Sequence, residues 1–146
     1  MISDYHTNKL RVRSCGLLVE DEKLLLIELF SPVTNQWTWL PPGGGVEFGE
    51  TLEEALKREF KEETGLQISI EQRIHINEII QPPIHAIEFY FIVKRIDGVL
   101  SVGTDPELEA EQQIIRNIGF YTKSQIQDMN VAPSFLKNSF WESIKG

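Results

Sequence analysis

The stretch GGVEFGETLEEALKREFKEETGL, residues 44–66, combines glycines with the strongest helix signal in the chain. Thr51 and Glu54 form the S/T-x-x-E capping box that starts a helix. Gly65 is a typical left-handed cap that ends one. Three consecutive glycines, Gly43–Gly45, precede the helix and favour a flexible backbone segment that another group can approach closely. We therefore expect a glycine loop followed by a helix that ends at Gly65.

The glutamates of this helix fall on the face that should point inward. On a wheel of about 100° per residue, Glu59, Glu62 and Glu63 share a stripe with apolar side chains, while Lys57 and Lys61 lie opposite. The apolar members of the stripe are Leu52, Ala55, Leu56 and Phe60. Three carboxylates at helical spacing crowd one another, so we expect either raised pKa values or a bound cation.

A solvated, glutamate-rich helix is the common alternative for such a composition. Arg58 points about 100° away from Glu59 on the wheel, which predicts that it neutralises the three carboxylates poorly. A hard divalent cation such as Mg²⁺ or Mn²⁺ fits better, because it prefers carboxylate oxygen and keeps positions open for water and phosphate. The adjacent glycine loop, whose backbone can approach an anion, favours the metal interpretation.

The same residues resemble a known family motif. Gly44, Glu50, Arg58 and the run at 59–66 fill every fixed position of the pattern Gx5Ex7REUxEExGU, the Nudix box. Phe60 stands where that family usually has an aliphatic residue, and an aromatic ring can fill the same apolar position. The preceding WLPPGG, residues 39–44, also resembles the family's approach to the box.

This resemblance implies an α/β fold, an α/β/α sandwich with a mixed central sheet. It also implies hydrolysis of a pyrophosphate bond in a nucleoside diphosphate linked to another moiety, with Mg²⁺ or Mn²⁺ as cofactor. Carried onto this chain, Glu59, Glu62 and Glu63 are the expected catalytic and metal-binding residues, with the Gly43 carbonyl as a further metal ligand. Glu50 and Arg58 are expected to hold the loop against the helix by an ion pair.

The general base and the substrate contacts are less defined. Glu62 is the first candidate for the general base, because a glutamate of the box often acts as the base in the family that this chain resembles. The alternative is the acidic stretch of Glu107, Glu109 and Glu111. That stretch can equally be a solvated loop. The expected substrate-binding residues are Gly44, Gly45 and Trp39.

Other features bear on the substrate. Trp37 and Trp39 can stack on a base, although one of the two is expected in the core. Arg11, Arg13 and Lys23 can hold a phosphate or simply be surface charges, and the histidines His6, His75 and His85 are expected to be structural or exposed. Glu28 occupies the region where many family members carry a phosphate-binding arginine. Pro82 lies sixteen residues beyond Leu66, and a proline at this distance from the box resembles the ADP-ribose pyrophosphatase subgroup. Nucleoside triphosphates and oxidised nucleotides remain equally plausible substrates.

Patterns outside the box predict alternating strands and helices. The expected strands are residues 10–20, 23–30, 37–40, 66–80, 84–96, 99–103 and 113–121, and the expected helices are 123–129 and 134–144. This order fits a layered α/β domain, which we expect to be a single one over residues 1–146.

Composition limits the classes of function. The 146 residues include 14 basic and 22 acidic ones, a net charge of −8, which argues against binding polymeric nucleic acid. The single Cys15 cannot form an internal disulfide. Without an apolar leader or membrane segment, we expect a cytoplasmic monomer or homodimer with a small nucleotide-type substrate and no membrane partner. A non-catalytic sensor of a nucleotide or nucleotide sugar is the alternative function.

Overall fold

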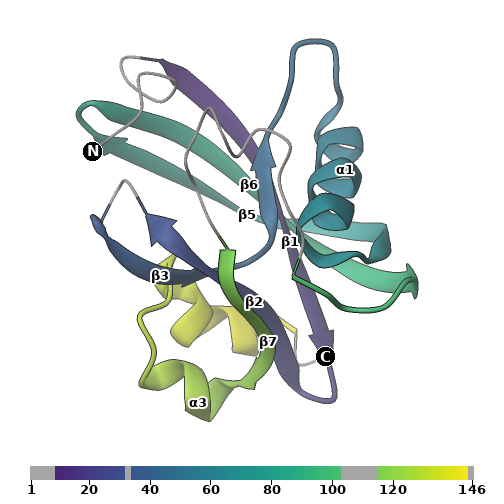
Figure 1. Ribbon diagram of the computed structural model, residues 1–146. Helices are drawn as coiled ribbons and strands as arrows, with labels where there is room; N and C mark the ends of the chain where they lie inside the picture. Colours follow the sequence, from purple (N-terminus) through teal and green to yellow (C-terminus); the bar gives the residue numbers. More distant parts are fainter. Residues whose placement is uncertain (1–8, 32–33, 103–114, 145–146) are drawn as a thin grey trace.

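Three long strands form the centre of the computed structural model, which describes residues 9–31, 34–102 and 115–144 (Figure 1). Strand β1 (Leu10–Glu20) runs parallel to β6 (Ile84–Asp97), and β5 (Gln67–Gln81) pairs antiparallel with β6. The two strands expected on either side of Pro82-Pro83 are therefore present. Their β-branched and aromatic residues suit a sheet that is covered on one or both faces.

A second group of strands is built around β2 (Lys23–Ser31). It joins β1 through a two-residue turn in which Asp21 and Glu22 both have positive φ, 52° and 60°, as the right-handed twist of a tight hairpin requires. Strands β3 (Gln36–Leu40) and β7 (Ile115–Thr122) pair antiparallel with β2. The strand order is β3-β2-β1-β6-β5, with β4 (Gly43–Gly45) paired to β1 and β7 to β2. The sheet is mixed, as expected.

The helix at residues 51–65 forms as its sequence predicts. Helix α1 (Leu52–Thr64) begins at the capping box of Thr51 and Glu54, in which both reciprocal hydrogen bonds are present, and ends at Gly65 with φ 78°. Its apolar face packs on a buried cluster that includes Leu18, Leu25, Leu56 and Phe60. The exposed lysines of α1 lie on the opposite side.

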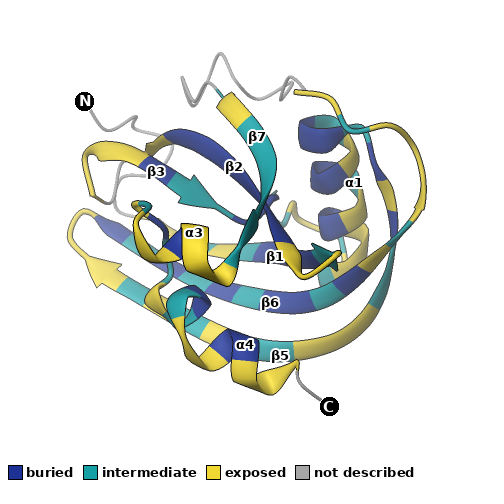
Figure 2. Ribbon diagram, turned by 90° about the horizontal axis from the view of Figure 1, so that it is seen from below, coloured by how far each residue is buried: buried dark blue, intermediate teal, exposed yellow. Residues whose placement is uncertain are grey.

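The other face of the strands is covered by shorter helices. These are α3 (Lys123–Gln127), the 3₁₀ helix η1 (Ser134–Lys137) and α4 (Ser139–Ser143). They pack on a second cluster that contains Leu17, Leu24 and Leu26, the residues that alternate with Leu18 and Leu25 along β1 and β2. Helices thus lie on both sides of the strands (Figure 2), and the α/β/α sandwich is confirmed.

Three local expectations are wrong. Gly43–Gly45 is a strand and not a flexible segment, because its backbone pairs with residues 13–15 of β1. Residues 99–102 form no strand, although Ser101 N–H donates to the Thr64 carbonyl beyond the end of α1. The expected helix at 134–144 is divided at Asn138, whose φ of −143° and ψ of −80° are not helical. None of the described helices is long and apolar enough to cross a membrane.

Candidate active site

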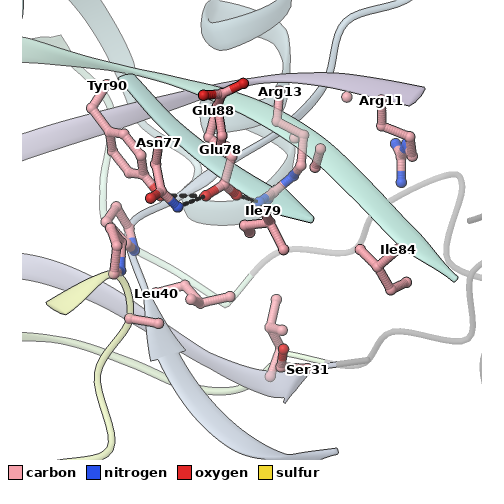
Figure 3. A pocket seen from close by; sticks show the side chains of 18 of the residues that line it. Arg11, Arg13, Ser31, Leu40, Asn77, Glu78, Ile79, Ile84, Glu88 and Tyr90 are labelled. Carbon is pink, nitrogen blue, oxygen red and sulfur yellow. Dashed lines mark hydrogen bonds and ion pairs between the residues drawn. The ribbon is translucent and has the colours of Figure 1, made fainter. Parts of the chain in front are cut away.

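A cavity of about 400 Å³ opens where β4, the start of β1, the end of β5 and the start of β6 meet (Figure 3). Its lining includes polar and charged residues (Arg11, Arg13, Glu59, Glu63, Asn77, Glu78, Glu88 and Tyr90), the glycines of β4, and apolar residues (Ile27, Leu29, Leu40, Ile79, Ile84, Ala86 and Pro133). Charged and apolar walls therefore face one space, which suits a ligand that has both kinds of surface.

Two of the predicted glutamates lie against the glycine strand. Glu59 and Glu63 are buried, with exposed fractions of 1% and 5%, and both line the cavity. The Gly43 N–H donates to Oε1 of Glu63 over 2.8 Å. A Cβ on Gly44 would lie 2.5 Å from Cδ of Glu59, so glycine at this position makes room for the carboxylate. The structure thus brings Gly43, Gly44, Glu59 and Glu63 together.

Glu62 and Gly45 lie at the rim of this group. The Glu62 side chain is 24% exposed, consistent with its position at the border of the buried face of α1. Gly45 lines the cavity at the open end of β4, and a Cβ there would clash with the Arg11 guanidinium. The interior-facing stripe of three glutamates is therefore two buried carboxylates and one half-buried carboxylate.

The prediction that Arg58 neutralises the three carboxylates poorly is wrong for Glu59 and Glu62. Its Nη1 lies 2.8 Å from Oε1 of Glu59 and 3.6 Å from Oε2 of Glu62. The wheel angle describes where the side chain leaves the helix, but the long arginine side chain bends back over its own turn. The expected pair with Glu50 is also present, with both nitrogen–oxygen distances 2.8 Å. Hydrogen bonds from Arg58 lower the pKa of Glu50 to about 2.

The donor set fits a hard divalent cation. Carboxylate oxygens and a backbone carbonyl are the ligands that Mg²⁺ and Mn²⁺ prefer, and the glycines of β4 leave space beside Glu59. Within residues 9–31, 34–102 and 115–144, no three His, Cys, Asp or Glu side chains converge closely enough to hold a metal as they stand. Glu59 and Glu62 both pair with Arg58 in this arrangement.

Sequence reasoning missed the charged group on another wall of the cavity. Glu88 of β6 is 4% exposed and forms an ion pair with Arg13 of β1. It also accepts hydrogen bonds from the Asn77 amide (3.0 Å) and the Tyr90 hydroxyl (2.9 Å). The available signal was a glutamate within the apolar run of residues 84–93, because a buried charge in a strand needs a partner.

We predicted that Trp39 contacts the substrate, but its side chain does not line the cavity. Alternation along β3 points Leu40 into the cavity and Trp39 to the other face, where its ring packs edge-on against Tyr121 at 4.9 Å. The expectation that one of the two tryptophans faces the core is confirmed by this packing. Trp37 is partly exposed and lies against the guanidinium of Arg116, 3.9 Å from the ring centroid.

The remaining candidates lie elsewhere. Glu28 accepts two hydrogen bonds from Arg116, of 3.1 and 2.9 Å, and is not among the residues that line the cavity. His75 stacks on Phe135 at 3.8 Å, as expected of a structural histidine, whereas His85 lines the cavity. The alternative bases Glu107, Glu109 and Glu111, and likewise His6, lie outside the described residues.

Comparisons with known proteins identify the family to which this fold belongs. A family model described as "NUDIX domain" matches residues 9–129. The chain is 38% identical over 105 residues to the ADP-ribose pyrophosphatase of Methanocaldococcus jannaschii, covering 70% of this chain and 61% of that protein. It is 33% identical over 93 residues to the 8-oxo-dGDP phosphatase NUDT18 of Homo sapiens, covering 64% and 27%. The chain thus spans less than two thirds of these relatives.

Solved structures of the same architecture are also similar. A NUDIX hydrolase from Nitrosomonas europaea has a TM-score of 0.74 at 19% identity, covering 92% of this chain and 88% of that one. The MutT protein from Methanosarcina mazei has the same TM-score and identity, covering 95% and 98%. At this identity the likeness establishes the fold alone.

Proposed function

The chain belongs to the Nudix family, and from that premise we propose that it is a divalent-metal-dependent hydrolase of a pyrophosphate bond. The substrate class is a nucleoside diphosphate linked to another moiety. One observation carries this proposal: the buried carboxylates of Glu59 and Glu63 face a glycine strand at the wall of a cavity. Carboxylate oxygens gathered at the wall of a cavity are the ligands that a hard divalent cation prefers.

The residues that would hold the metal are Glu59, Glu62, Glu63 and the carbonyl of Gly43, with Mg²⁺ or Mn²⁺ as the ion. When bound, such an ion neutralises phosphate oxygens and lowers the pKa of a coordinated water. The protein itself contributes a fixed carboxylate geometry, because the Gly43 N–H holds one oxygen of Glu63.

The other residues of the site position these groups. Arg58 fastens the loop before α1 through Glu50 and also donates to the Gly45 carbonyl over 3.2 Å. Without side chains, Gly44 and Gly45 allow phosphate oxygens to approach the backbone. The half-buried Glu62 is our candidate for accepting a proton from the attacking water, because it shares Arg58 with the buried Glu59 and its side chain is 24% exposed.

Two relatives indicate which substrates to test first. One relative is named an ADP-ribose pyrophosphatase and another an 8-oxo-dGDP phosphatase. Both substrate types consist of a nucleoside, a diphosphate and, for ADP-ribose, a second sugar. We propose that the substrate of this chain shares the nucleoside diphosphate core.

The test is hydrolysis of a panel of nucleotides with and without metal. The panel contains ADP-ribose, 8-oxo-dGDP and nucleoside di- and triphosphates, and phosphorus NMR identifies the bond that is cleaved. We expect turnover only with Mg²⁺ or Mn²⁺, and we expect Glu62→Gln to lower kcat by roughly 10²- to 10⁴-fold. Glu53→Gln, on the exposed side of the same helix, is the matched control and should retain activity. Absence of turnover of every panel member by the wild type would overturn the proposal.

A further inference from the structure

Three neighbouring strands place a row of polar side chains on one face of the sheet. In the parallel pairing of β1 with β6, Arg13 lies beside Glu88, and in the antiparallel pairing of β5 with β6, Asn77 lies beside Glu88. Tyr90 follows Glu88 by two residues and therefore points to the same face. Figure 3 shows Arg13, Asn77 and Tyr90 directed at the Glu88 carboxylate.

This row faces away from the helix that carries the metal-site glutamates. Ser14, the residue after Arg13, points to the opposite face, where its hydroxyl donates to the Leu52 carbonyl of α1. Phe91, the residue after Tyr90, likewise belongs to the cluster under α1. Arg13 and Glu88 therefore lie on the face opposite Glu59, and the cavity connects the two sides around β4.

The Glu88 carboxylate is fully engaged by three donors. One oxygen pairs with Arg13, and the other accepts from both Asn77 and Tyr90. Burial raises the pKa of Tyr90 well above its usual range, so its hydroxyl remains a donor. A carboxylate held in this way is a poor proton acceptor for water. Its effect is to fix the guanidinium of Arg13 in one orientation.

The Arg13–Glu88 pair also has no net charge. A guanidinium carries five N–H donors, of which the hydrogen bond to Glu88 uses one. Arg13 thus presents hydrogen-bond donors to the cavity while its positive charge is compensated. A neutral acceptor atom can use these donors in full, whereas a phosphate gains less electrostatic attraction from a guanidinium that a carboxylate already compensates.

The surroundings favour a flat, uncharged ligand group. Apolar side chains line the same cavity from several strands, among them Leu40 of β3, Ile79 of β5, and Ile84 and Ala86 of β6. A nucleobase offers apolar faces to such walls and ring nitrogens or carbonyl oxygens at its edge. The neighbouring donors of Arg13 can bind that edge.

We propose that Arg13 donates hydrogen bonds to the nucleobase of the substrate and that Glu88 is the positioning residue that fixes Arg13 for this contact. The inference rests on the proposed function, since it assigns the two ends of a nucleoside diphosphate to two sides of one cavity. The phosphates lie at the glutamates of α1, and the base lies at the Arg13–Glu88 pair.

The experiment measures binding without hydrolysis. Adenosine, guanosine, cytidine and uridine are titrated in the absence of metal by saturation-transfer NMR, with methyl ribofuranoside as the sugar-only probe. Inorganic pyrophosphate with Mn²⁺ is titrated separately by calorimetry. We expect at least one nucleoside, and not the riboside, to bind the wild type. Its Kd should rise tenfold or more in Arg13→Gln and Glu88→Gln, while the Kd of pyrophosphate changes less than twofold.

Two further variants keep the test decisive. Arg95→Gln removes the ion pair with Glu20, which lies outside the cavity lining, and should bind nucleosides like the wild type. Arg13→Lys retains the charge beside Glu88 but not the planar fork of donors, so it should lose nucleoside binding even where Glu88→Gln proves too unstable to measure.

The inference is overturned by any of three results. These are no nucleoside binding by the wild type, unchanged nucleoside binding in the Arg13 and Glu88 variants, or an equal loss of pyrophosphate binding, which would make Arg13 a phosphate ligand. Failure of the proposed function is a separate observation, because it is the absence of metal-dependent turnover by the wild type.

Discussion

Nη1 of Arg58 lies 2.8 Å from Oε1 of Glu59, its neighbour in α1. The Arg58 guanidinium therefore compensates the charge of Glu59, the most buried carboxylate of the site. The same guanidinium holds Glu50 by two hydrogen bonds. Arg58 therefore links the loop that follows β4 to the helix, and it occupies space beside the oxygens that a metal ion would need.

Comparison of two variants separates these two roles of Arg58. Glu50→Gln and Arg58→Gln both break the loop pair, and we expect each to lower kcat/KM by about 10- to 100-fold, as is usual for residues that orient metal ligands. Only Arg58→Gln also releases Glu59. We therefore expect Arg58→Gln to bind Mn²⁺ roughly 3- to 10-fold more tightly than Glu50→Gln. This ratio of affinities corresponds to about the free energy of one ion pair.

The measurement is Mn²⁺ titration followed by electron paramagnetic resonance. Lys57→Gln, an exposed cation one residue before Arg58 on the outer side of α1, is the control and should match the wild type. Weaker Mn²⁺ binding by Arg58→Gln than by Glu50→Gln would show that Arg58 supports the metal site and does not compete with it.

The close approach of Gly44 to the Glu59 carboxylate leads to a second prediction. The Cβ of Gly44→Ala would lie 2.5 Å from the Glu59 carboxylate carbon, so the carboxylate would be displaced from its position beside the glycine strand. We expect Mn²⁺ affinity to fall tenfold or more, by analogy with the loss of other groups that orient metal ligands. Calorimetric titration with Mn²⁺ measures this change.

Gly49→Ala provides a contrast for that experiment. No atom lies within 4 Å of a Cβ at Gly49, but its φ is 93°, so alanine there should lower the free energy of unfolding by roughly 1 kcal/mol through backbone strain. Mn²⁺ affinity should stay near that of the wild type. Equal losses of affinity in both glycine variants would refute the steric explanation for Gly44.

Local sequence signals predicted most of the elements, whereas contacts between distant strands escaped them. The helix at 52–64 was predictable because Thr51, Glu54 and Gly65 act within a few residues of its ends. The pairing of Gly43–Gly45 with β1 was not, since glycine has low strand propensity and only the register with β1 imposes it. Tertiary pairing therefore decided the conformation of this segment.

The candidate site likewise contains some residues that the sequence predicted and others that it did not. Glu59, Glu62 and Glu63 were found because helical spacing places them on one face. Arg13 and Glu88 were not connected, because 75 residues separate them and only the parallel register of β1 and β6 brings them together. A glutamate in an apolar strand indicates that a partner exists, but the sequence does not identify it.

The single cysteine gives a third prediction. Cys15 is 1% exposed and lies in the core beneath the second helical layer. Burial raises the pKa of its thiol to about 12, so the reactive thiolate is scarce near neutral pH. We expect iodoacetamide to leave the native protein unmodified at pH 7.5 and to alkylate Cys15 fully in denaturant, as mass spectrometry would detect. Rapid alkylation of the native protein would contradict the burial of this thiol.

The pair between Glu50 and Arg58 predicts a specific dependence of stability on pH. Hydrogen bonds from Arg58 lower the folded-state pKa of Glu50 to about 2, below the value of about 4.3 in an unfolded chain. A lowered carboxyl pKa stabilises the fold above the unfolded-state pKa, and this contribution disappears as the pH falls toward the folded-state value. The Glu50 side chain is 20% exposed, so the contribution should be about 1 kcal/mol.

Urea unfolding of the wild type and of Glu50→Gln between pH 8 and pH 2 measures this contribution. The difference in unfolding free energy should be constant above about pH 5. It should shrink between about pH 4 and pH 2, where Glu50 is protonated in the unfolded chain but still largely ionised in the folded state. Glu53→Gln, which changes an exposed carboxylate of the same helix and leaves the Glu50–Arg58 pair intact, is the reference variant. A difference between wild type and Glu50→Gln that stays the same down to pH 2 would mean that the ionised pair with Arg58 does not stabilise the fold.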